Sequence, residues 1–273
     1  MILPLFRSCL ILLFTAILPC AAPESESWDR WKVHEASSRL RIDHGKWQCF
    51  LAKHLDTVAA DGVNRVRYGR TSGTDRKGLE SYLADLQSVK VSALDRKEQR
   101  AYWINLYNAK TIAIVLDRYP VKSIRDIDLS RGLLKNGPWD AKVLEVEGIK
   151  MSLNDVEHRI LRPLWKDKRI HFALNCASLG CPNLASWAYT AKNTDSLLEK
   201  GARDFINSRH GARAEGMTLT LSSIFEWYRE DFGKNEKELL DFLSNYAESP
   251  LKGMLRGHAG RIKYHYNWSL NDA

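Results

Sequence analysis

One loop of the chain holds the residues with the clearest chemical potential. The segment HFALNCASLGCP, residues 171–182, combines His171 with two cysteines, Cys176 and Cys181, and contains serine and glycine. Loops often carry reactive groups on a rigid scaffold. A cysteine nucleophile needs a base that produces its thiolate and donors that receive the oxyanion. The segment therefore predicts thiol chemistry with Cys176 as the nucleophile.

Two histidines are candidates for the base. Residues 169–175 alternate like a short strand, which would place His171 roughly 16 Å from Cys176 if the chain is fully extended. His158 follows Glu157 on the preceding predicted helix and is the second candidate. Glu157 is the candidate that would orient the base. The choice between the two histidines stays open at this point.

Several polar side chains are candidates for substrate contact. Asn105 and Asn108 share one stripe of a predicted helix that is apolar on nearly every other side. A buried amide without a partner costs about 1–3 kcal/mol, so each must either tie down a loop or face a polar pocket. In the second case Asn175 and Ser178, beside Cys176, would complete a substrate-binding surface.

Other interpretations of the two cysteines remain open. Cys176 and Cys181 have four residues between them, and a disulfide that pins the loop is the first alternative. Zinc ligation together with His171 is a weaker alternative, because one histidine and a C-x4-C spacing do not complete a typical site. The third interpretation is that either cysteine is simply a small, buried apolar residue. The sequence contains no G-x-S-x-G, no P-loop and no dinucleotide fingerprint, so we expect no cofactor and no metal.

The first residues resemble a secretory signal peptide. Residues 1–22 read MILPLFRSCLILLFTAILPCAA, a positive start followed by a short apolar run and small residues. An uncleaved anchor and lipidation at Cys20 are the alternatives. Cleavage would remove Cys9 and Cys20 and leave three cysteines, among them Cys49. We therefore expect an exported protein, periplasmic or secreted, in a compartment where disulfides persist.

Composition excludes several classes of protein. The 273 residues are 44% hydrophobic and 27% charged, which excludes a disordered chain, a collagen-like repeat and a multi-pass membrane protein. The net charge of +8 comes from scattered basic residues, so we expect no nucleic-acid partner. No segment after the signal is long and apolar enough to span a membrane.

The remaining pattern predicts how the site is positioned. We expect an N-terminal leader over residues 23–45 and one globular domain over residues 46–273. The fold class is α+β: a helix-rich domain with a small, mainly antiparallel sheet around a buried central helix. Helices are predicted over residues 46–59, 79–87, 95–117, 152–161, 194–207, 222–232 and 236–247. Strands are predicted over residues 143–151 (a hairpin), 169–175, 217–221 and 261–268.

Five ordered motifs carry a resemblance to a known family. They are AYWINLYNA (101–109), SLNDVEHRILR (152–162), RIHFALNCASLGCPNL (169–184), LSSIFEWYREDF (221–232) and YHYNWSLN (264–271). Together they resemble family 547 of the domains of unknown function, over roughly residues 47–271. The resemblance implies an exported or envelope protein of bacteria with a thiol-enzyme-like arrangement. Asn267 stands where the family's pattern leads us to expect an aspartate.

These observations give two functional hypotheses. The first is an exported thiol-dependent hydrolase or transferase that acts on an amide, peptide or thiol-peptide substrate. The alternative is a non-catalytic envelope binding or interaction module, in which a Cys176–Cys181 disulfide holds a recognition loop. Both expect a small-molecule or peptide ligand as the partner.

Overall fold

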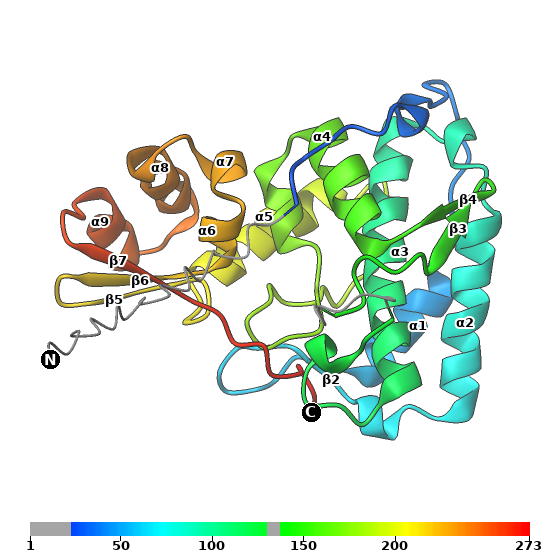
Figure 1. The fold of residues 1–273 in the computed structure, drawn as a ribbon, viewed down its shortest axis with the longest axis horizontal. Helices are drawn as coiled ribbons and strands as arrows, with labels where there is room; N and C mark the ends of the chain where they lie inside the picture. The colour runs from blue at the N-terminus through cyan, green and yellow to red at the C-terminus, as the bar shows by residue number, and fades with distance from the viewer. Residues whose placement is uncertain (1–22, 130–136) are drawn as a thin grey trace, which may run out of the picture.

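A single buried helix, α3 (Arg96–Arg118), lies at the centre of the larger of two lobes (Figure 1). It begins at Asp95, whose carboxylate accepts hydrogen bonds from the backbone N–H groups of Lys97 and Glu98. Its side chains from Glu98 to Ala109 are all buried, so the helix has no solvent face over this stretch. The computed structural model describes residues 23–129 and 137–273. The predicted signal peptide, residues 1–22, lies outside them.

The other helices of this lobe pack around α3. They are α1 (Gly45–His54), α2 (Gly73–Ser88), the π-helical segment η5 (Asp155–Leu161) and α4 (Arg162–Trp165). Two short antiparallel pairs lie at its edges: β1 (Leu55–Asp56) with β2 (Arg65–Val66), and the hairpin β3 (Leu144–Val146) with β4 (Ile149–Met151). Aromatic rings fill the space between the helices, with Trp47, Tyr82 and Trp103 almost completely buried.

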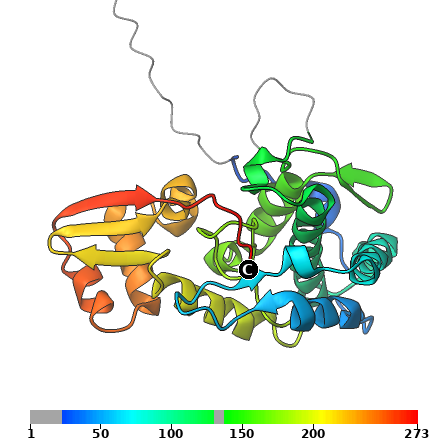
Figure 2. The same ribbon diagram turned by 90° about the horizontal axis from the view of Figure 1, so that it is seen from below.

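The second lobe has its own apolar core. Helix α5 (Thr194–Ile206) leads into a three-stranded sheet and four short helices (Figure 2). The sheet has the order β5 (Ala212–Glu215), β6 (Thr218–Ser222), β7 (Arg261–His265); β5 and β6 are antiparallel, whereas β6 and β7 are parallel. The helices are α6 (Ile224–Trp227), α7 (Arg229–Phe232), α8 (Glu236–Tyr246) and α9 (Leu251–Arg256).

The C-terminal tail crosses from the sheet back to the larger lobe (Figure 1). The Asn267 carbonyl accepts a hydrogen bond of 2.8 Å from the Gly180 N–H, and the Ser269 carbonyl accepts one of 2.8 Å from Leu179 N–H. A Cβ on Gly180 would lie 2.7 Å from the Asn267 nitrogen, so only glycine fits this close approach. The tail thus fixes the loop that contains the two cysteines.

The structure confirms the predicted α+β class and the buried central helix, and most predicted elements occur near their expected positions. The strand predicted over residues 169–175 is wrong. That segment contains a 3-10 helix, η6 (Lys168–Phe172), which begins where the Asp167 carboxylate accepts from Arg169 N–H. A short apolar run does not distinguish a strand from a helical turn, and no strand among the described residues pairs with it. Within the described residues, no helix has the length and apolar character needed to cross a membrane.

Candidate functional site

The predicted catalytic residues meet in a cavity of about 300 Å³ where the two lobes join. The larger lobe contributes Glu157, His158, His171 and the two cysteines. The aromatic and apolar side chains that complete the wall are Tyr107, Trp139, Leu174, Ile224, Trp227, Tyr228, Tyr266 and Trp268. Junctions of this kind are common places for small-molecule sites.

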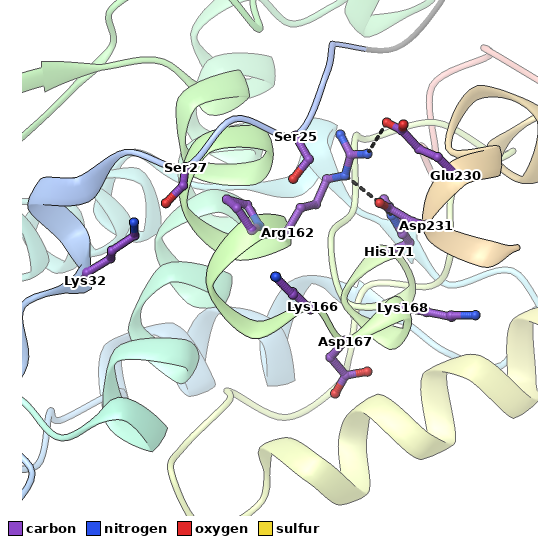
Figure 3. Close-up of a pocket in the computed structure, with 11 residues that line it drawn as sticks. Ser25, Ser27, Lys32, Arg162, Lys166, Asp167, Lys168, His171, Glu230 and Asp231 are labelled. Atoms are coloured by element: carbon purple, nitrogen blue, oxygen red, sulfur yellow. Dashed lines mark hydrogen bonds and ion pairs between the residues drawn. The ribbon is translucent and has the colours of Figure 1, made fainter. Parts of the chain in front are cut away.

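A second cavity, of about 530 Å³, shares His171 with the first (Figure 3). It is rich in charged groups: Figure 3 shows Arg162 in contact with Glu230 and Asp231, and Lys166 on the same wall. His171 and its charged neighbours therefore separate two cavities of different character, one aromatic and one charged.

The imidazole of His171 is held in one orientation by Asp231. His171 Nε2 lies 2.7 Å from Asp231 Oδ2, and Arg162 Nε donates to the same oxygen at 2.6 Å. Burial raises the pKa of Asp231, but the hydrogen bonds from His171 and Arg162 outweigh it and hold the pKa well below its usual range. Since an ionised carboxylate only accepts, Nε2 of His171 carries the hydrogen, and in the neutral ring Nδ1 carries the lone pair.

The His158 ring is held by Arg162, a cation, instead of by a carboxylate. Its Nδ1 lies 3.1 Å from Nη1 of Arg162, and a guanidinium can only donate, so this nitrogen accepts the hydrogen bond. Burial lowers the pKa of His158, which favours the neutral ring. Its one lone pair is therefore occupied by Arg162. Of the two candidate bases, His171 is the one whose lone pair is not held by a cation.

Glu157 lies beside His171 at the buried end of the cavity. Its Oε1 is 3.8 Å from His171 Nδ1, and the hydroxyls of Tyr107 and Tyr228 hydrogen-bond to its carboxylate. Burial is the main cause of the raised pKa of both tyrosines, with the Glu157 charge adding to it. The hydroxyls therefore stay protonated and donate. The carboxylate that hydrogen-bonds to the His171 ring is therefore Asp231, whereas Glu157, the predicted orienter, lies 3.8 Å from Nδ1.

The π-helical segment η5 explains why Glu157 and His158, although consecutive, both line the cavity. The segment follows Ser152, whose hydroxyl accepts from Asp155 N–H. Two carbonyls of η5, those of His158 and Arg159, accept hydrogen bonds from the backbone of residues 26 and 28. The wider turn is thus supported by the extended chain that runs beside it, and such turns are frequent at functional sites.

The structure joins Cys176 and Cys181 in a disulfide, with their Cα atoms 6.2 Å apart. The Tyr266 hydroxyl lies 3.0 Å from the sulfur of Cys176 and 3.1 Å from that of Cys181. The Ser178 hydroxyl lies 3.3 Å from Cys176 Sγ and 2.9 Å from the Tyr266 oxygen. Ala177 has a φ of 59°, in the left-handed region, so the chain turns sharply here. Hydroxyl groups therefore surround the sulfurs on the cavity side.

The three predicted substrate-binding asparagines are used inside the fold. Asn105 donates to the Tyr189 carbonyl and accepts from Tyr189 N–H. Asn108 donates to the Ala173 carbonyl and accepts from Asn175 N–H. Asn175 donates to the Pro182 carbonyl and accepts from Ala177 N–H. The amides of Asn105 and Asn108 tie the 173–189 loop to α3, the other role that their sequence pattern allowed, and the Asn175 amide holds the loop to itself.

Replacing Asn108 with leucine is expected to lower the free energy of unfolding by about 2–5 kcal/mol. The change leaves the Ala173 carbonyl and the Asn175 N–H buried without partners, and each such group costs about 1–3 kcal/mol. Urea unfolding of the variant and the wild type measures the difference. A loss below about 0.5 kcal/mol, the range of ordinary surface substitutions, would show that the loop does not depend on this amide.

Sequence reasoning missed several residues of the site. The sequence pattern assigned no chemical role to Asp231, Arg162 or Tyr107. The sequence feature that could have identified them is a charged or hydroxyl side chain among apolar neighbours, as at Asp231 in IFEWYREDF. Asn267, where an aspartate was expected, accepts a hydrogen bond from Ser269 N–H. The carboxylate that hydrogen-bonds to His171 is that of Asp231, which comes from α7 instead.

The comparison with family models covers three of the five motifs, and the motifs at 221–232 and 264–271 lie outside the matched residues. Residues 91–206 match a family model described as "Protein of unknown function, DUF547", so the chain resembles this family from just before α3 to the end of α5. Neither the curated proteins nor the solved structures gave a match. The matched part contains Glu157, His171 and both cysteines, whereas Asp231 lies outside it. Among the described residues, no group of three or more His, Cys, Asp or Glu side chains is arranged to hold a metal ion.

Proposed function

We propose that the protein is a thiol-dependent hydrolase or transferase that acts on an amide or peptide bond. Cys176 is the nucleophile and His171 the base. The observation that carries the proposal is that both side chains line one cavity, while Asp231 orients the His171 ring with its Nδ1 lone pair free. A nucleophile, a base and an orienting carboxylate are the parts that acyl-transfer chemistry needs.

The proposed reaction begins from the reduced protein. Nδ1 of His171 takes the proton of the Cys176 thiol, and the thiolate forms a C–S bond with the substrate carbonyl. The hydroxyls of Ser178 and Tyr266, both close to the sulfur, are the donors that we assign to the developing oxyanion. Collapse breaks the C–N bond, and the leaving amine takes the proton from His171. Water or a second amine then attacks the thioester and releases the acyl group, which restores the thiol.

Glu157 and Asp231 support the protonated state of His171 during this cycle. After it accepts the thiol proton, the ring is a cation with Asp231 at 2.7 Å on one nitrogen and Glu157 at 3.8 Å on the other. Opposite charges at this range stabilise the cation. Both carboxylates therefore stabilise the protonated His171 ring rather than the substrate carbonyl.

The disulfide makes this activity depend on redox state. While Cys176 and Cys181 are bonded, no thiolate is available for attack. A dithiol reductant supplies two electrons and two protons, breaks the S–S bond and leaves two thiols. The bonded form is thus the resting state of the proposed enzyme.

A second candidate function rests on the same disulfide. If the bond is permanent, it fixes the loop that forms one wall of the cavity, and the protein is a non-catalytic binding or interaction module. For either function we propose export to the periplasm or the exterior, supported by the signal-like residues 1–22 and by an environment in which a disulfide persists.

The rate of alkylation distinguishes the two functions. In the reduced protein at neutral pH, limiting iodoacetamide is expected to modify Cys176 at least about tenfold faster than Cys49, because the cavity base raises the thiolate fraction of Cys176. Cys49 is free and exposed and serves as the internal control. Peptide mapping by mass spectrometry measures both rates. Faster modification of Cys49, or resistance of the disulfide to reduction in the folded protein, would favour the binding module.

A further inference from the structure

The proposed reaction does not explain the aromatic wall of the cavity. Six of its lining residues are aromatic: Tyr107, Trp139, Trp227, Tyr228, Tyr266 and Trp268. They come from both lobes and from the C-terminal tail, so distant parts of the chain bring rings to one place. Apart from the Tyr266 hydroxyl, the proposed reaction uses none of these aromatic side chains, and their collection at the cavity points to the ligand.

The rings of the wall contact one another and attract positive charge. Tyr266 and Trp268 have ring centroids 4.6 Å apart, and Trp227 lies 4.8 Å from Tyr266. The guanidinium of Arg125 lies over the Trp268 ring at 5.1 Å, within the range of a cation–π interaction. Arg162 makes the same contact with Tyr228 at 4.9 Å. The chain's own cations thus already occupy faces of this aromatic group.

A carboxylate lies among the same rings. Glu157 is only 7% exposed and lines the cavity, where it faces the hydroxyls of Tyr107 and Tyr228. An ionised carboxylate has about four acceptor positions, so two hydroxyls do not exhaust it. A cation that enters the cavity would meet a negative charge at one end and aromatic rings along the wall.

We propose that this cavity binds a ligand through an alkylammonium group. Aromatic rings combined with a carboxylate recognise such groups, because ring quadrupoles attract the cation and the carboxylate neutralises it. A volume of about 300 Å³ suits a small molecule or one side chain of a peptide. This recognition rests on the rings and Glu157 and needs no reaction at Cys176. If the proposed enzymatic function also holds, the substrate carries its ammonium group close to the reacting carbonyl.

Choline and its uncharged carbon isostere, dimethylbutanol, test the proposal directly. The two have the same shape, so any difference in affinity reports the charge. Choline is expected to bind at least about tenfold tighter in calorimetric titrations, and to change the fluorescence of the cavity tryptophans. Equal affinity for the two compounds would show that the wall recognises apolar shape and would overturn the proposal, as would the absence of choline binding.

Matched variants assign the interaction to residues. Glu157→Gln is expected to weaken choline binding by about tenfold or more, whereas Glu226→Gln, an exposed neighbour of Trp227 outside the cavity lining, should leave it unchanged. Arg125→Gln should tighten binding several-fold, because a competing cation is removed from Trp268. Choline binding is measured in the disulfide form, in which no thioester can form, so the result does not depend on the proposed reaction. Equal binding by the two glutamate variants would contradict the assignment of Glu157.

Discussion

Replacing Asp231 with asparagine is expected to lower the free energy of unfolding by about 3 kcal/mol. The carboxylate is the shared acceptor of Arg162 and His171, and the Arg162 side chain is only 3% exposed. Removal of one partner of a buried pair leaves the other charge uncompensated, which costs more than the pair itself contributes. Urea unfolding at neutral pH measures the loss. Asp241→Asn, which breaks the exposed pair with Lys237 on α8, is the matched control and should cost less than about 0.5 kcal/mol.

The same carboxylate predicts a dependence of stability on pH. The folded-state pKa of Asp231 is lower than its unfolded value, because the hydrogen bonds from His171 and Arg162 outweigh the opposing effect of burial. Its contribution to stability is therefore complete above the unfolded pKa of about 3.9 and is lost as the pH falls toward the folded value. The gap in unfolding free energy between wild type and Asp231→Asn should narrow below about pH 4. A gap that stays constant through the acid range would contradict the role of this ion pair.

The second large effect concerns the reaction. In the reduced protein, His171→Gln is expected to slow acyl transfer from a thioester substrate by about a thousandfold, because general-base assistance and thiolate formation are both lost. The disulfide form should show no transfer until a dithiol is added. His34→Gln removes an exposed histidine that is far from His171 in the sequence, and it serves as the control. Equal rates for the two histidine variants would exclude His171 as the base.

The sequence contains enough information for the fold class and for the residues that lie close together in the chain. Apolar periodicity and the Asp95 cap define α3, and the turn at Glu147 defines the β3–β4 hairpin. Cys176, His171 and Glu157, which the motifs single out, all line one cavity. These features depend on local propensity and on the need to bury apolar side chains, which a sequence displays directly.

Features set by distant contacts could not be predicted in the same way. Asp231 meets His171 across 60 positions of the chain, and Tyr266 reaches Cys176 across 90. The amide of Asn108 could serve a ligand or a loop, and only the position of the Asn175 N–H decides for the loop. The segment after Arg169 is too short and too apolar for its pattern to separate a strand from a 3-10 helix. Tertiary packing, rather than local pattern, determines each of these.

The central claim is that Cys176 forms an acyl intermediate in this cavity. The most direct measurement is to mix the reduced protein with an acetyl thioester, quench the reaction in acid and locate the acetyl group by mass spectrometry. We predict an acetyl group on Cys176 that disappears with time as water releases it, and no modification of this position in the Cys176→Ser variant. An acetyl group found only on the exposed Cys49, or no acetylation at all, would contradict the account.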